Sequence, residues 1–182
     1  MTTRQPRSLP RIWLMTDERL GDGLWQALAR LPRGSGVVFR HHATPAGERR
    51  RLFDAIRRMS RARGLLLLLA GPPALAAAWG ADGTHGRYGA RRAGRQIRSV
   101  PVHDGREMTV ARRIGADLVF VSPLHATRSH PGAAPLGRSR FGLLARYAPC
   151  PVVALGGMTR RRAGEARALG AYGWAAIDGL RG

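Results

Sequence analysis

The sequence predicts a single α/β domain: a TIM (β/α)8 barrel that is trimmed and lacks its last helix. Short apolar runs, typical of buried parallel strands, alternate with helical patterns along the 182 residues. One motif, a helix that ends on glycine and leads at once into an apolar strand, recurs at 75–85, 110–121 and 166–177. The chain is shorter than the roughly 250 residues of a full barrel. An open, doubly wound sheet is the alternative architecture.

Apolar runs mark eight strands, a number that indicates closure into a barrel. In chain order they are 12–16, 37–40, 65–70, 83–85, 99–102, 118–121, 152–155 and 174–177. Asp82 and Asp117 come just before the fourth and sixth strands, at the bottom of the barrel, where a carboxylate is expected to stabilise a turn.

The helices fall between these strands, and carboxylates such as Asp22 and Glu48 lie at helix starts, where capping is their usual role. The expected helices are 23–31, 46–62, 73–79, 106–114, 138–147 and 160–169, with a weaker one near 88–96. Only 179–182 follow the eighth strand, which leaves one flank of the barrel without a helix. We expect the N-terminal arm, 1–10, or the second subunit of a homodimer to cover this flank.

The net charge is +20 and the isoelectric point is about 12.0. Such values usually indicate a polyanionic partner. However, all 31 basic residues are arginines, they are scattered along the chain, and lysine and asparagine are absent. A coding bias explains this composition better than binding does, so we do not expect nucleic acid as a partner. The positive field would still attract a phosphorylated small molecule.

The single cysteine, Cys150, excludes a disulfide or a multi-cysteine zinc site within one chain. Residues 1–11 lack the apolar core of a signal peptide, and the longest apolar run, 65–70, is far too short to span a bilayer. We therefore expect a cytoplasmic protein with no membrane partner.

The segment 151–178 carries the most specific signal for a binding site. It consists of a buried strand that ends on Gly156 and Gly157, an arginine-rich helix, and a second buried strand. This arrangement exposes backbone N–H groups, to which a phosphate can bind. Tight turns also use glycine pairs, so it is the strand-helix-strand context that favours a phosphate site.

The histidines all follow strand ends and therefore point to a functional mouth on the C-terminal face of the barrel. They are His41, His42, His85, His103, His125 and His130. The spacing of the histidines does not predict a metal site. In the loop after the sixth strand, Thr127, Ser129 and His130 are candidates for wrapping a phosphate, with Arg40 closing on the same anion. The alternative for this loop is a solvated lid.

Carboxylates are scarce at the mouth. Of the eleven in the chain, only Asp17, Glu18, Asp104 and Asp178 are expected there. Because Mg²⁺ prefers carboxylate oxygens, a paired-carboxylate magnesium site is poorly supplied.

The order of motifs resembles the thiamine phosphate synthase and TenI family of β/α barrels over nearly the whole chain. The matching segments are 13–17, 39–40, 81–85, 99–103, 115–117, 122–123, 127, 131–132, 154–159 and 175–177. The resemblance implies a synthase that uses Mg²⁺ to join a pyrimidine methyl diphosphate to a thiazole phosphate. It also implies that the thiazole phosphate rests on Gly156, Gly157, Ile177 and Asp178.

This chain departs from the family pattern in the metal half-site. The Asn-Asp pair that follows the third strand in the synthases is replaced by Ala70 and Gly71. The polar run at the second strand keeps only Arg40, beside His42, and a loop lysine is replaced by His130. The expected cofactor is Mg²⁺ only if synthase activity survives.

The sequence thus predicts a divergent family member in thiamine metabolism that binds a thiazole phosphate-type ligand and has largely lost its magnesium diphosphate site. One alternative is a metal-free tautomerase-like enzyme. In the family's tautomerases the catalytic histidine lies where Pro123 stands here, so His125, two residues further on, and His103 are the candidate catalytic residues. The other alternative is a noncatalytic protein that binds a phosphorylated metabolite or a polyanion.

Overall fold

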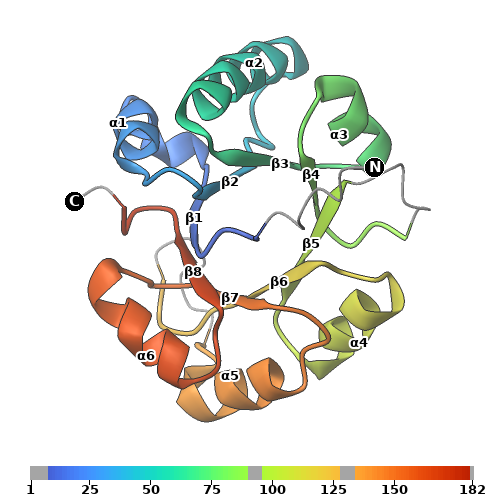
Figure 1. Ribbon diagram of the computed structural model, residues 1–182, viewed down its shortest axis with the longest axis vertical. Helices are drawn as coiled ribbons and strands as arrows, with labels where there is room; N and C mark the ends of the chain where they lie inside the picture. The colour runs from blue at the N-terminus through green and yellow to red at the C-terminus, as the bar shows by residue number, and fades with distance from the viewer. Residues whose placement is uncertain (1–7, 90–95, 128–133, 181–182) are drawn as a thin grey trace, which may run out of the picture.

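The protein is a closed barrel of eight parallel strands, as predicted, and the open sheet is wrong. The structure is a computed structural model that describes residues 8–89, 96–127 and 134–180. The strands follow one another around the barrel in chain order, and the last pairs with the first, Leu14 lying opposite Ala176 (Figure 1). They are β1 (Ile12–Met15), β2 (Gly36–Phe39), β3 (Leu66–Ala70), β4 (Gly83–His85), β5 (Ile97–Val102), β6 (Leu118–Val121), β7 (Val152–Ala154) and β8 (Gly173–Ala176).

The helices pack around the outside of the barrel (Figure 1). They are η1 (Glu18–Leu20), α1 (Gly23–Arg30), α2 (Ala46–Arg63), α3 (Pro73–Trp79), α4 (Gly105–Arg113), α5 (Gly137–Arg146), η2 (Arg160–Arg162) and α6 (Ala163–Ala168). The expected helix at 160–169 is thus a short 3-10 turn followed by α6. Most of the expected helix near 88–96 lies outside the described residues, and Tyr88 and Gly89 are not helical.

The recurring helix-glycine-strand motif has the predicted backbone geometry. Gly80, Gly115 and Gly170 have φ angles of 69°, 66° and 94°, a region that glycine reaches without steric cost. Each glycine turns the chain directly from the end of a helix into the next strand.

Trp13 and Phe120 fill the barrel interior. Trp13 is fully buried, its Nε1 donates to the carbonyl of Pro10 at 2.7 Å, and its ring meets that of Phe120 edge-on at 5.4 Å. Gly36 faces the Trp13 ring so closely that a Cβ at position 36 would overlap it. The large indole therefore requires glycine on the neighbouring strand.

No helix follows β8 in the described part of the chain, which continues to Leu180. Leu9 and Leu180 pack against the core, and the carbonyl of Leu9 accepts a hydrogen bond from the Tyr172 hydroxyl at 2.6 Å. Residues 1–7 of the arm lie outside the described residues, so coverage of the flank by the arm or by a second subunit stays a prediction.

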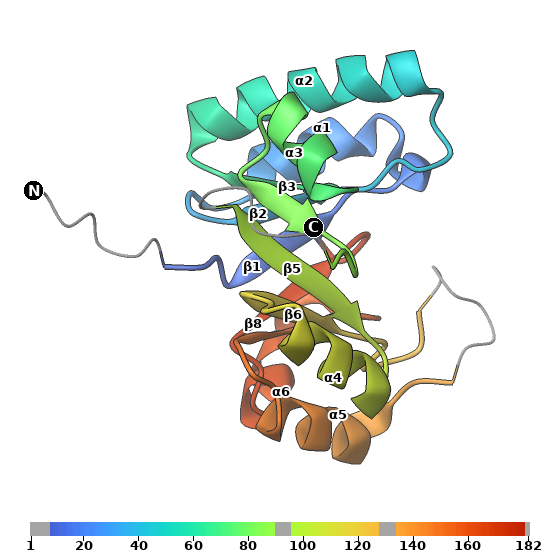
Figure 2. The same cartoon turned by 90° about the vertical axis from the view of Figure 1, so that its right-hand side faces the viewer.

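Because the strands are parallel, their C-terminal ends all lie at the same end of the barrel. Figure 2 shows the strands running away from the N-terminus, toward the end that carries the loop after β6. Among the described helices, none is long and apolar enough to cross a membrane.

Candidate functional site

A cavity of about 490 Å³ opens at the C-terminal ends of the strands. It brings together seven of the residues proposed from the sequence, namely Arg40, His103, Thr127, Gly156, Gly157, Ile177 and Asp178. His42 and His125 are not among its lining residues. Ser129 and His130 lie outside the described residues. The C-terminal mouth predicted from the sequence therefore contains a cavity. Active sites in this fold generally lie at this end of the barrel.

Gly156 and Gly157 form the turn after β7 with φ angles of 93° and 60°. A Cβ on Gly156 would lie 2.6 Å from Cα of Pro123, and one on Gly157 would lie 2.5 Å from the carbonyl oxygen of Ala126. The glycines are thus required both by the backbone conformation and by close packing under the loop after β6. Within the described part of the chain, their amides have no hydrogen-bond acceptor, and both residues line the cavity.

Arg162 places a positive charge beside these amides. It lines the cavity, and its Nη1 donates to the carbonyl of Gly157 at 2.5 Å. Sequence reasoning did not single out this residue, because it is one of three consecutive arginines, 160–162, that follow the Gly-Gly turn after two intervening residues. Met158, Leu155 and Pro123 add apolar surface to the same cavity, which suits a ligand that combines an anion with a flat ring.

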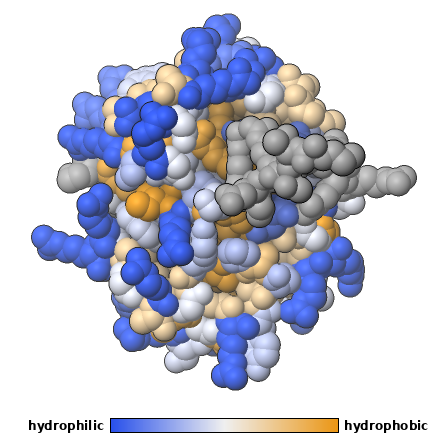
Figure 3. Space-filling model, viewed as in Figure 1, coloured by the Kyte–Doolittle hydropathy of each residue, from blue (hydrophilic) through white to orange (hydrophobic). Residues whose placement is uncertain are grey.

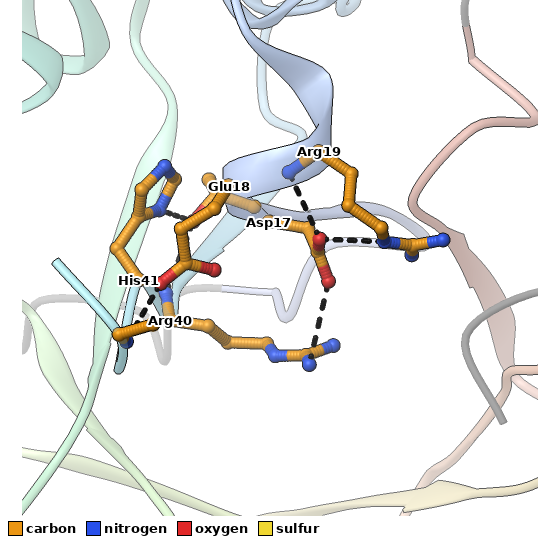
Figure 4. A network of polar contacts seen from close by, with 7 residues as sticks. Asp17, Glu18, Arg19, Arg40 and His41 are labelled. Carbon is orange, nitrogen blue, oxygen red and sulfur yellow. Dashed lines mark hydrogen bonds and ion pairs between the residues drawn. The ribbon is translucent and has the colours of Figure 1, made fainter.

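Asp17 ties together the ends of β1 and β2 at the opposite rim. Its carboxylate accepts from Nε of Arg19 at 2.8 Å and lies 3.6 Å from Nη2 of Arg40 (Figure 4). Burial disfavours the charged form of Asp17, but the hydrogen bonds from Arg19 and the charges of Arg19 and Arg40 outweigh it and hold the pKa below its usual value. Arg40 is therefore fixed at the cavity edge as an oriented cation.

Two other mouth carboxylates serve the local backbone. Glu18 accepts from the amide of Ala43 at 2.8 Å, and Asp104 caps α4 by accepting from the amide of Glu107 at 2.8 Å. Asp178 lines the cavity, and its charge contributes to raising the pKa of Arg19 after the larger effect of Asp17. Asp178 thus lies within the field of an arginine.

His103 lines the cavity and contacts a carboxylate that does not line it. Its Nδ1 lies 2.8 Å from Oε2 of Glu107, which also forms an ion pair with Arg87. A carboxylate on Nδ1 favours the tautomer that carries the proton there. Nη2 of Arg87 lies 3.3 Å from the same Nδ1 and would donate only to an unprotonated nitrogen. The shorter contact, with Glu107, favours the proton on Nδ1 and orients the His103 ring at the cavity.

His125 is placed differently. Its Nε2 lies 3.4 Å from Oε2 of Glu165 on α6, and that carboxylate also pairs with Arg138 at 2.8 Å. Burial and the charge of Arg162 lower the pKa of His125, despite Glu165. The His125 ring thus packs between the loop after β6 and α6, outside the set of residues that line the cavity.

His85 forms part of the barrel interior at the end of β4. Its Nδ1 lies 2.9 Å from Oγ of Ser99, and its ring meets Phe120 edge-on at 5.1 Å. Because the Ser99 hydroxyl donates to the carbonyl of Thr84 at 3.2 Å, it accepts from His85, which fixes the proton on Nδ1. Burial lowers the pKa of His85 from 6.5 to about 3.

This depressed pKa predicts acid sensitivity. Between pH 6.5 and about 3 the unfolded chain binds a proton at His85 that the folded protein excludes. The free energy of unfolding should therefore fall on acidification through that range, by about 1.4 kcal/mol per pH unit from this residue. Urea denaturation of the protein and of His85→Gln at pH 6.0, 5.5 and 5.0 measures this effect. The variant should show the shallower slope, and equal slopes would contradict the prediction.

Arg49, on the first turn of α2, joins the ends of β2 and β3. Its guanidinium donates to the carbonyls of Arg40 at 2.9 Å and Ala70 at 3.0 Å, and it lies 5.3 Å from the ring centres of Phe39 and Trp79. Nothing in the sequence distinguishes this residue from the other arginines. A cation therefore occupies the rim beside Ala70 and Gly71.

Comparisons with known proteins identify the family of this chain. The family model described as thiamine monophosphate synthase matches residues 14–180. The thiamine-phosphate synthase of Methanoregula boonei is 32% identical, over 94% of this chain and 85% of that protein. That of Chloroflexus aurantiacus is 28% identical, over 93% of this chain and 84% of that protein.

A solved structure shares the fold. The thiamine phosphate pyrophosphorylase of Pyrococcus furiosus is 22% identical with a TM-score of 0.79, and the match covers 96% of this chain and 92% of that one. The family match spans nearly the whole barrel, from the second half of β1 through the glycine turn after β7 to the end of β8. This chain therefore belongs to the thiamine monophosphate synthase family.

Proposed function

We propose that this protein binds a thiazole phosphate-type ligand at the C-terminal mouth of the barrel and that its magnesium diphosphate half-site is largely lost. The observation that carries the proposal is the turn after β7. There, the amides of Gly156 and Gly157, which have no acceptor among the described residues, lie beside Arg162 in a cavity that also has apolar walls. Backbone N–H groups with an adjacent guanidinium favour a phosphate, and the apolar surface favours the ring attached to it.

The residues near β3 fit Mg²⁺ poorly. The positions that the resemblance assigns to the metal-binding pair hold Ala70 and Gly71, and the carbonyl of Ala70 already accepts from Arg49. Within the described residues, no group of three or more His, Cys, Asp or Glu side chains could hold a metal ion. We therefore infer that arginines, and not Mg²⁺, compensate the negative charge of a phosphate bound at this mouth.

Calorimetric titration with thiazole phosphate, with and without Mg²⁺, tests the proposal. Saturable heat that is the same in both conditions is expected, and the unphosphorylated thiazole alcohol should give at least tenfold weaker binding because it lacks the charge-assisted contacts. If thiazole phosphate gives no heat in either condition, the phosphate site is refuted. If heat appears only with Mg²⁺, the claim about the metal half-site is refuted.

Replacing Arg162 with glutamine should weaken binding of thiazole phosphate by about tenfold to a hundredfold, because a charged hydrogen-bond donor beside the phosphate is lost. Arg161→Gln removes the same charge one residue away, from an exposed side chain that does not line the cavity. The two dissociation constants, measured at the same ionic strength, separate a local contact from the general positive field. Equal weakening in both variants would contradict a specific role for Arg162.

The His103–Glu107 pair favours a second candidate, proton transfer on a phosphorylated thiazole without a metal. His103 lines the cavity, and its Nδ1 is bonded to a carboxylate that orients it. His125 is the other histidine proposed from the sequence. Its ring lies beside Glu165, with Nε2 3.4 Å from Oε2. The geometry supports His103 as the base.

His103→Gln should lower the rate of thiazole carboxylate phosphate isomerisation, followed by proton NMR, by about a hundredfold or more, because the general base is lost. His125→Gln should retain most of the rate and serves as the matched control. The reverse order of the two effects would assign the base to His125, and no isomerisation by the unaltered protein would remove this candidate.

A further inference from the structure

A second cavity, of about 500 Å³, lies at the opposite end of the barrel, below β3 and between the C-terminal turns of α2 and α3. Its walls come from the arm before β1, from the ends of the two helices and from the start of β3. The residues of the mouth take no part in it.

Two polar atoms at this cavity are buried without a partner. Oγ of Ser60, in a residue only 1% exposed, has no hydrogen bond to any described residue, and neither has Nε of Arg57. A buried donor without an acceptor is costly. Both atoms belong to side chains that line the cavity, so a rotation of each side chain toward the cavity would bring its polar atom to an acceptor placed there.

The charge of the cavity favours an anion. Arg57 and Arg61 both contribute to its lining, whereas Asp82 is its one acidic residue. Oδ2 of Asp82 already accepts from the amide of Leu67 at 2.9 Å. Arg57 is held at one end by an ion pair with Asp54, 3.5 Å away, so its guanidinium is oriented before any ligand binds.

The helix ends do not cancel this positive charge. The last carbonyls of α2 and α3 would ordinarily repel an anion. Here the amides of Gly64 and Leu65 bond back to carbonyls of α2, and those of Gly80 and Ala81 bond back to carbonyls of α3. The exposed negative ends are thus largely neutralised by their own caps.

Apolar surface adjoins these donors. Leu65, Leu66 and Pro10 line the same space, and Figure 3, which looks onto this end, shows apolar surface among projecting hydrophilic side chains. A volume of this size is typical of small-molecule sites. We propose that this cavity is a second ligand site, separate from the mouth, which takes a small organic phosphate, with the phosphate on Arg57 and Ser60 and the organic part on the leucines.

NMR of the full-length protein with labelled arginine side chains tests this proposal directly. The Nε–H signal of Arg57, assigned from its loss in Arg57→Gln, should shift saturably when inorganic phosphate is added. With AMP as the phosphate monoester, the same shift should saturate at severalfold lower concentration, and adenosine should produce none. Equal affinities for phosphate and AMP would overturn the proposed contact between the leucines and the organic part of the ligand. If neither compound gave a saturable shift at concentrations up to roughly 20 mM, the site itself would be overturned.

Matched variants separate this site from the rest of the molecule. Ser60→Ala, a conservative change, should raise the apparent dissociation constant about fivefold. Arg58→Gln, on the exposed side of α2, and Arg162→Gln, at the mouth, should leave it unchanged. If Ser60→Ala binds as tightly as the unaltered protein, or if Arg162→Gln abolishes the Arg57 shift, the assignment to this cavity is wrong.

Discussion

Replacement of Trp13 by alanine is expected to lower the free energy of unfolding by about 3–5 kcal/mol. The indole is fully buried in the barrel, packs edge-on against Phe120, and donates a hydrogen bond to Pro10. Gly36 leaves no side chain that could move into the space, so the neighbouring strand cannot fill the cavity. Urea denaturation followed by far-ultraviolet circular dichroism measures the change without relying on the tryptophan that is removed.

Trp25→Ala is the control for this experiment. Trp25 lies on α1 and is 39% exposed, so its removal should change stability by less than about 1 kcal/mol. A Trp13→Ala variant no less stable than Trp25→Ala would mean that the barrel interior relaxes around the missing ring, contrary to the packing described.

The second large effect is expected from Gly156→Ala, which should destabilise the protein by about 2–4 kcal/mol. The new Cβ must adopt a φ of 93° and would lie 2.6 Å from Cα of Pro123, so strain and overpacking add. The turn and the loop after β6 would have to separate, which would also misplace the amides proposed to hold phosphate. Binding of thiazole phosphate should therefore be lost together with stability.

Gly164→Ala is the matched substitution. Gly164 lies in α6, and a Cβ there would meet no atom within 4 Å. Because alanine favours helix over glycine, stability should stay the same or rise by up to about 1 kcal/mol. If the two glycine variants were equally stable, the close approach at Gly156 would not be a real constraint.

The barrel was predictable because its signals are local. Apolar runs, glycine caps and strand spacing each depend on a few neighbouring residues, so all eight strands were placed to within two residues. The observed strand ends differ from the predicted ones where hydrogen bonds between residues far apart in the sequence determine them. β5, for example, begins at Ile97, whose amide donates to the carbonyl of Asp82, the residue just before the neighbouring strand β4.

The site was predictable only in part, because it depends on where side chains point. The glycine turn and Arg40 were identified from chain position, and both line the cavity. His125 was also placed near the mouth, but its ring lies beside Glu165, forty residues further along the chain, and does not line the cavity. Arg162 and Arg49 could not be distinguished from the other arginines by type, since their roles come from carbonyl partners that only the folded chain supplies.

The Arg49 bridge affects what a carboxylate at this rim could bind. A carboxylate introduced at Gly71, where a Cβ would meet only ordinary contacts, would follow a carbonyl that already accepts from the Arg49 guanidinium. That guanidinium would compete with a divalent cation for the new carboxylate. If the metal half-site is lost as proposed, an acidic residue here would favour metal binding more strongly once Arg49 was also replaced, so the effects of the two substitutions would not be additive.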